Sequence, residues 1–118
     1  MNLKLSTRMI EGISVIDCHG RIVFGEEASL LRETVKKLLP QNKQLVINLA
    51  GVTYIDSGGL GTLVGLYTSA RAVGGDVKLS QLTHRVGELL QVTKLVTVFE
   101  VFDDETQAAR SFKKGAVA

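Results

Sequence analysis

Residues 45–63 read LVINLAGVTYIDSGGLGTL, and the change of hydrophobic period within this stretch indicates the fold. Residues 45–49 form a short apolar run, which is typical of a strand covered on both faces. The second half opens a helical pattern, in which apolar residues recur at Leu60, Leu63, Val64, Tyr67, Ala70 and Val73 before Gly74-Gly75. A buried strand that passes directly into a helix is typical of an α/β protein.

Strands and helices also alternate on both sides of this stretch. Before it, Leu3, Leu5, Thr7 and Met9 alternate with polar residues, which predicts a strand, and Glu11-Gly12 turns the chain into a second strand over residues 13–18. A helix follows from Glu26, with Ala28, Leu31, Val35 and Leu38 at helical spacing, and it ends before Pro40. The opening of the chain is therefore predicted to be a β-hairpin and a helix.

After it, residues 76–80 predict a strand, and Thr83 caps a short helix with Val86, Leu89 and Leu90 facing inward. A last strand is predicted over residues 98–102, and Asp104 with Gln107 begins a final helix. The sequence thus predicts one α/β domain over residues 1–118, with its core at about residues 3–114. It contains a mixed, mostly parallel sheet of about five strands, opened by a hairpin, with about four helices packed against it.

The composition narrows the classes of partner. Hydrophobic residues make up 45% of the chain and charged residues 22%, as in a globular protein with its own core. A single cysteine, Cys18, favours a reducing compartment, so we expect a cytoplasmic protein. The net charge of +2 is too small and too scattered for a nucleic-acid-binding surface, and no segment approaches the roughly 18 apolar residues of a membrane helix. We expect neither a nucleic-acid nor a membrane partner.

The glycine-rich stretch does not match the common nucleotide-binding motifs. Gly59 and Gly61 are followed by Val64 where a dinucleotide fingerprint requires a third glycine, and the chain contains no Gly-Lys-Ser/Thr. Cys18 and His19 are adjacent on a strand, so they point to opposite faces and cannot share a metal ion. We therefore expect no cofactor and no metal.

A serine hydrolase is the least favoured alternative. Ser57 would be the nucleophile, and His19 and His84 are the histidines available as a base. Neither lies in a sequence context that places it beside Ser57, and the stretch is not the G-x-S-x-G elbow that exposes a nucleophile. We therefore expect that the protein is not an enzyme.

Asp56 and Ser57 both suit the N-cap of the helix that follows, and the sequence leaves open which of them caps it. The glycines around them are unusual, because each costs roughly 0.5–1 kcal/mol against alanine inside a helix. We interpret Gly58, Gly59, Gly61 and Gly65 as space in which another surface can approach Ser57. The partial positive charge of a helix N-terminus would also tolerate a phosphate on this serine.

The segment Asp56-Ser57-Gly58-Gly59-Leu60-Gly61, after a buried strand and a hydrophobic lead-in at residues 52–55, resembles the signature of STAS domains. The branch that it most resembles is the bacterial anti-sigma factor antagonists. The opening hairpin, GRIV at residues 20–23, GGDVKL at residues 74–79 and the terminal helix also follow the order of the family.

This resemblance implies a partner-switching regulator of transcription. In such families the unmodified antagonist binds an anti-sigma factor, which is a serine kinase, and thereby frees a sigma factor. The kinase phosphorylates the motif serine and releases the antagonist, and a serine phosphatase resets it. By position, Ser57 is the implied phosphorylation site, and the implied partner-binding residues are Asp56, Ser57, Gly58, Gly59, Leu60 and Gly61.

The chain departs from the family pattern at two positions. Many members carry an acidic residue after the glycine that ends the second strand, as in G-x-(Leu/Ile)-Asp, in a region that often contributes to the partner surface. Here Arg21 follows Gly20 and no aspartate follows. Gly58 stands where serine is frequent, which leaves Ser57 as the only hydroxyl beside Asp56. The alternative within the same fold is a constitutive scaffold subunit of a sensory or lipid-transport complex, without phosphorylation.

Overall fold

The computed structural model describes residues 2–117 and the side chains of residues 2–113, so residues 1 and 118 of the predicted domain lie outside it. The strands are β1 (Leu3–Ile10), β2 (Ile13–Ile22), β3 (Gln44–Ile55), β4 (Asp76–Ser80) and β5 (Val101–Phe102). The helices are α1 (Glu26–Leu38), α2 (Ser57–Ala72), α3 (His84–Val92), the 3₁₀ turn η1 (Leu95–Thr97) and α4 (Glu105–Val117).

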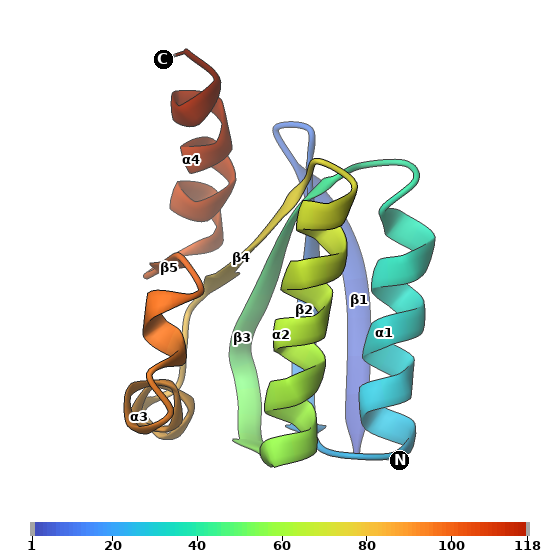
Figure 1. The fold of residues 1–118 in the computed structure, drawn as a ribbon, viewed down its shortest axis with the longest axis vertical. Coiled ribbons are helices and arrows are strands. Elements are labelled where there is room, and N and C mark those ends of the chain that lie inside the picture. The colour runs from blue at the N-terminus through green and yellow to red at the C-terminus, as the bar shows by residue number, and fades with distance from the viewer. Residues whose placement is uncertain (1, 118) are drawn as a thin grey trace.

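The five strands form one sheet in the order β1-β2-β3-β4-β5 (Figure 1). The β1–β2 pair is antiparallel, and each later pair is parallel. The hairpin turn is made by Glu11 and Gly12, whose φ angles of 49° and 85° are both positive, as the tight two-residue turn between twisted strands requires. The predicted mixed, mostly parallel sheet with an opening hairpin is therefore confirmed.

Helices cover both faces of the sheet, as the run at residues 45–49 predicts. Leu45 and Ile47 of β3 point into the larger core beneath α1 and α2, whereas Val46 points to the opposite face. There it packs against Ala109 and Phe112 of α4. Figure 1 shows α1 and α2 side by side in front of the sheet, with α3 and α4 beside β4 and β5. β3 is buried on both faces because each face has its own layer of helix.

The face under α4 also buries a charge that the sequence did not predict. The side chain of Lys78 on β4 is 7% exposed, and its ammonium group lies 2.6 Å from Oγ of Ser111 and 4.1 Å from the ring centroid of Phe112. Glu100 supplies a carboxylate oxygen at 3.5 Å. Hydrogen bonding and contact with an aromatic ring compensate the loss of water around a buried ammonium group.

The predicted strand over residues 98–102 is wrong in its extent. The structure has a 3₁₀ turn at Leu95–Thr97, and only Val101 and Phe102 pair with β4. Phe99 is buried and packs edge-on against Tyr67 of α2, with the ring centroids 5.4 Å apart. The apolar residues here cover the edge of the core by side-chain packing, and an apolar run of this length does not by itself distinguish a strand from such a segment.

None of the helices in the part of the chain that the structure describes is both long enough and apolar enough to cross a bilayer.

Candidate functional site

The candidate site lies where β3 passes directly into α2. Figure 1 shows this end of the sheet at the bottom of the view, together with the starts of α1 and α2 and with α3. Open parallel sheets commonly bind ligands at the carboxyl ends of their strands, because the following helices begin there. The predicted segment at residues 56–61 occupies this edge.

Asp56 is the N-cap of α2. Its Oδ1 accepts a hydrogen bond of 2.7 Å from the backbone N–H of Gly59. Both carboxylate oxygens also lie 3.1 Å from the backbone nitrogen of Phe24, in the loop between β2 and α1. These N–H groups favour the ionised carboxylate, so they hold the pKa of Asp56 below its usual value. One carboxylate therefore fixes both the start of α2 and the neighbouring loop.

Ser57 is the first residue of α2, and its side chain is exposed. Because Asp56 provides the cap, the Ser57 hydroxyl is not required for that role. Within residues 2–113 no hydrogen bond involves Oγ of Ser57. The first turn of α2 also lacks an acidic residue. The hydroxyl is thus presented at a helix N-terminus, uncommitted to any other group in this part of the chain.

Part of our interpretation of the glycines is wrong. Gly59 and Leu60 are buried, so they offer no open surface beside Ser57. A Cβ at Gly59 would overlap the carbonyl oxygen of Ile22 at the end of β2, and a Cβ at Gly58 would lie 2.7 Å from Cβ of Phe24. These two glycines allow the start of α2 to pack closely against its own neighbours.

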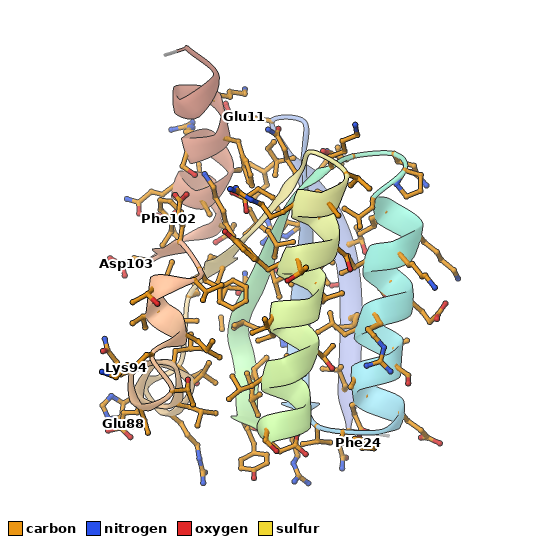
Figure 2. All side chains as sticks on the ribbon, in the orientation of Figure 1. Glu11, Phe24, Glu88, Lys94, Phe102 and Asp103 are labelled. Carbon is orange, nitrogen blue, oxygen red and sulfur yellow. The ribbon has the colours of Figure 1, made fainter. Side chains whose placement is uncertain are left out.

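Gly61 and Gly65 agree with the interpretation. A Cβ at either position would meet nothing within 4 Å. Together with Phe24 they line an open groove of about 520 Å³ between α1 and α2. The Phe24 side chain is 75% exposed, and Figure 2 shows it at the lower end of the molecule, between the starts of the two helices. Small residues therefore leave space on this side of Ser57.

A second groove, of about 530 Å³, lies on the other side of Ser57. It separates the β3–α2 junction from α3 and is lined by Tyr54, Ile55, Asp56, Ser57, Arg85, Val86, Glu88, Leu89 and Val92. The guanidinium carbon of Arg85 lies 5.4 Å from the ring centroid of Tyr54, and that of Arg21 lies 5.2 Å from the same centroid. This groove combines apolar contact area with charges of both signs, because Arg85 shares it with the carboxylates of Asp56 and Glu88.

The remaining candidates lie elsewhere in the structure. His84 is exposed on α3 and pairs with Glu88 at 3.0 Å, while His19 is exposed beside Gly51. Cys18 points the other way from His19, into the core, and burial raises the pKa of its thiol to about 12. Among the side chains that the structure describes, no group of three or more His, Cys, Asp and Glu residues is arranged to hold a metal ion.

Sequence reasoning missed Phe24, Tyr54 and Arg85 as parts of this surface. Phe24 could have been found from the sequence, because it is an aromatic residue next to Gly25 in the loop after the second strand. Tyr54 and Arg85 carried no such signal, because their proximity depends on how α3 packs against β3. One contact that positions α3 is made by the Thr83 hydroxyl, which donates a hydrogen bond of 3.2 Å to the carbonyl of Val52.

Comparisons with known proteins agree with this geometry. A family model described as the STAS domain matches residues 4–108. The anti-sigma-B factor antagonist of Bacillus subtilis (strain 168) is 32% identical over 102 residues, which cover 86% of this chain and 92% of that protein. The anti-sigma F factor antagonist of Paenibacillus polymyxa is 23% identical over 110 residues, covering 92% and 93%.

The fold is shared with a solved structure of this class. The anti-sigma factor antagonist SpoIIAA in its unphosphorylated form superposes with a TM-score of 0.79 at 18% identity, covering 94% of this chain and 97% of that one. The family match spans the strands, the helices and the serine segment described above. The chain therefore belongs to the STAS domain family, as the segment at residues 56–61 predicted.

Proposed function

We propose that this protein is an anti-sigma factor antagonist that acts in the cytoplasm as a partner-switching regulator of transcription, and not as an enzyme. In this proposal it binds an anti-sigma factor that is also a serine kinase. Phosphorylation of Ser57 releases it, and a serine phosphatase restores the binding form. The main supporting observation is the exposed Ser57 hydroxyl, which Asp56 frees from the capping role. The names of its relatives support the same class of partner.

The partner-binding segment is again residues 56–61, with two kinds of contribution. Ser57, Gly58 and Gly61 face outward or toward the grooves and make the contacts. Asp56, Gly59 and Leu60 act from the inside, because they hold the start of α2 in position. A rigid presentation of this kind reduces the entropy lost when a partner docks.

Because Asp56 and not Ser57 caps α2, no capping hydrogen bond of Ser57 has to break before phosphoryl transfer. A bond forms between Oγ and the γ-phosphorus of ATP, the bond from that phosphorus to the bridging oxygen breaks, and ADP leaves. The hydroxyl proton passes to a base of the kinase. The product carries about −1.5 to −2 charge at a helix start that lacks other acids, so α2 tolerates it. The new charge then acts on the partner's surface instead of on this fold.

The first test is phosphorylation. The protein is incubated with ATP and the kinase encoded nearest to its gene, and phosphate is located by peptide mass spectrometry. We expect one phosphate on Ser57 and none on Ser57→Ala. Ser69→Ala is the matched control, because Ser69 is also an exposed serine of α2 and its loss should leave transfer unchanged. Equal incorporation into Ser57→Ala would contradict the proposal.

The second test is binding of the purified kinase, measured by titration calorimetry with unmodified and phosphorylated protein. A charge placed in an interface costs several kcal/mol, so phosphorylation should weaken binding by at least about 100-fold. Equal affinity of the two forms would instead favour the constitutive scaffold subunit.

A further inference from the structure

The arginines of the described chain divide into two groups. Arg8, Arg32, Arg71 and Arg110 each direct their guanidinium group at a side-chain oxygen of a neighbouring residue. Arg21 and Arg85 do not: within residues 2–113 neither forms an ion pair or donates a side-chain hydrogen bond. Their guanidinium groups lie instead beside the ring of Tyr54. Both guanidinium groups therefore lie close together at Tyr54, which is three residues before Ser57 in the chain.

Arg85 and Ser57 also share one space. Both line the groove of about 530 Å³ between the β3–α2 junction and α3. The position of α3 is set locally, since Thr83 caps its first turn and also bonds to Val52 of β3. Arg85, two residues later, is thereby held on the wall opposite the start of α2. Its exposed side chain is free to rotate about this fixed backbone.

We propose that Arg85 binds the phosphate of phosphorylated Ser57 across this groove, and that Arg21 adds positive potential from the side of β2. This inference rests on the proposed phosphorylation of Ser57 and describes how the modified state is held. A guanidinium group presents two parallel N–H donors that match two oxygens of a phosphate. Phosphoserine is thus the anion that these two arginines otherwise lack.

The two carboxylates that line the groove with Arg85 both contact other groups. The Asp56 carboxylate accepts from the backbone N–H groups of Gly59 and Phe24. Glu88 pairs with His84 on α3. Neither carboxylate therefore holds Arg85 away from a phosphate on Ser57.

The bond would connect the start of α2 to α3 and draw Arg85 away from Tyr54. The groove would then be occupied by the protein's own phosphate, and Arg85 would no longer be available to a partner. Phosphorylation would thus change the surface in two ways, by adding charge and by closing the groove. Both effects oppose docking at the same face.

The test measures the second ionisation of phosphoserine by ³¹P NMR. Phosphoserine is incorporated at position 57 during translation, so that no kinase is needed. An opposite charge stabilises the dianion, and we expect its pKa, ordinarily about 6, to be lower by about one unit than in Arg85→Gln. Both proteins retain the other charged side chains of the groove, so the difference between them isolates Arg85.

Three further variants complete the test. Arg85→Lys keeps the charge and should keep part of the lowered pKa. Arg21→Gln should raise the pKa by less than Arg85→Gln does. Arg110→Gln, an exposed arginine of α4 at the other end of the molecule, should have no effect. Identical phosphoserine titrations in the parent protein and Arg85→Gln would overturn the inference. Because phosphate is introduced without the kinase, this result is separate from a failure of phosphorylation.

Discussion

The helices α2 and α4 begin with the same chemistry and use it differently. Each is preceded by an aspartate whose Oδ1 accepts from the backbone N–H three residues later, at 2.7 Å for Asp56 and 2.8 Å for Asp104. In α4 the first residue is Glu105, whose carboxylate bonds to Arg8 of β1 at 2.9 Å. In α2 the first residue is Ser57, and the first turn contains no acid.

This difference shows that the first residue of a helix can either make a structural contact or remain exposed for modification. Both starts are fixed by a capping aspartate, so neither needs its first residue as the cap. α4 uses that residue to attach itself to the hairpin. α2 leaves its first residue exposed, where an anion can be added next to the positive end of the helix. Substitutions at one helix start, compared with the other start or with neighbouring positions, should test this difference.

The largest expected effect is at Gly59. In Gly59→Ala the new Cβ would overlap the carbonyl oxygen of Ile22, so β2 and α2 must separate. Forced overpacking of this kind costs about 3 kcal/mol of unfolding free energy. Urea denaturation measures it. Gly61→Ala is the matched control, because its Cβ meets nothing within 4 Å and the helix should gain about 0.5–1 kcal/mol. Equal destabilisation of both variants would contradict the close packing described at Gly59.

Removing each capping carboxylate in turn should destabilise the protein by different amounts at the two helix starts. Asp104→Ala should lower the unfolding free energy by about 1 kcal/mol, the usual cost of an N-cap. Asp56→Ala should cost about 2 kcal/mol, because the N–H of Phe24 also loses its acceptor. Thermal and urea unfolding of both variants test this order. A smaller loss for Asp56→Ala than for Asp104→Ala would show that the bond to Phe24 adds no stability.

The cost of Asp56→Ala should also depend on pH. The pKa of Asp56 is lower in the folded protein than in the unfolded chain, because N–H groups of Gly59 and Phe24 favour the carboxylate. The stabilisation is therefore fully present above the unfolded value of about 4. It is lost as the pH falls through the folded pKa. Unfolding curves of the parent protein and Asp56→Ala should converge as the pH is lowered below about 4.

The contact that attaches α4 should have a smaller effect. Arg8 bonds to Asp17 and to Glu105, but its side chain is 42% exposed, so water weakens both pairs. Arg8→Ala is expected to lower the unfolding free energy by about 0.5–1 kcal/mol at low salt. At 1 M salt most of this difference should disappear, because the Debye length is then only about 3 Å. A loss independent of salt would indicate packing by the arginine stem instead.

The smallest expected effect is at Ser57. Ser57→Asp places a negative charge in the empty first turn of α2 and should raise the unfolding free energy by about 0.3–1 kcal/mol at low salt. Glu105→Ser, the reverse change at α4, should lower it. Thermal unfolding of the two variants measures both. Destabilisation by Ser57→Asp would mean that α2 does not tolerate an added anion, and would argue against a phosphate at this position.

The sequence by itself determined most of the secondary structure. The period at residues 26–38, the apolar run at residues 45–49 and the glycines at residues 74–75 report local backbone preferences, which act between residues close in the chain. The segment at residues 56–61 also located the candidate site and the family. These features were predictable because their physical causes are local.

The tertiary structure decided which groups at that site are used in capping and packing and which remain exposed. Asp56 takes the capping role and Ser57 does not, because the same carboxylate also reaches Phe24 in another loop. Gly59 is required by the nearby end of β2, and Lys78 is buried because α4 closes over it. Tyr54 and Arg85 meet only through the packing of α3. Each of these depends on contacts between residues far apart in the chain. A local sequence pattern does not predict such contacts.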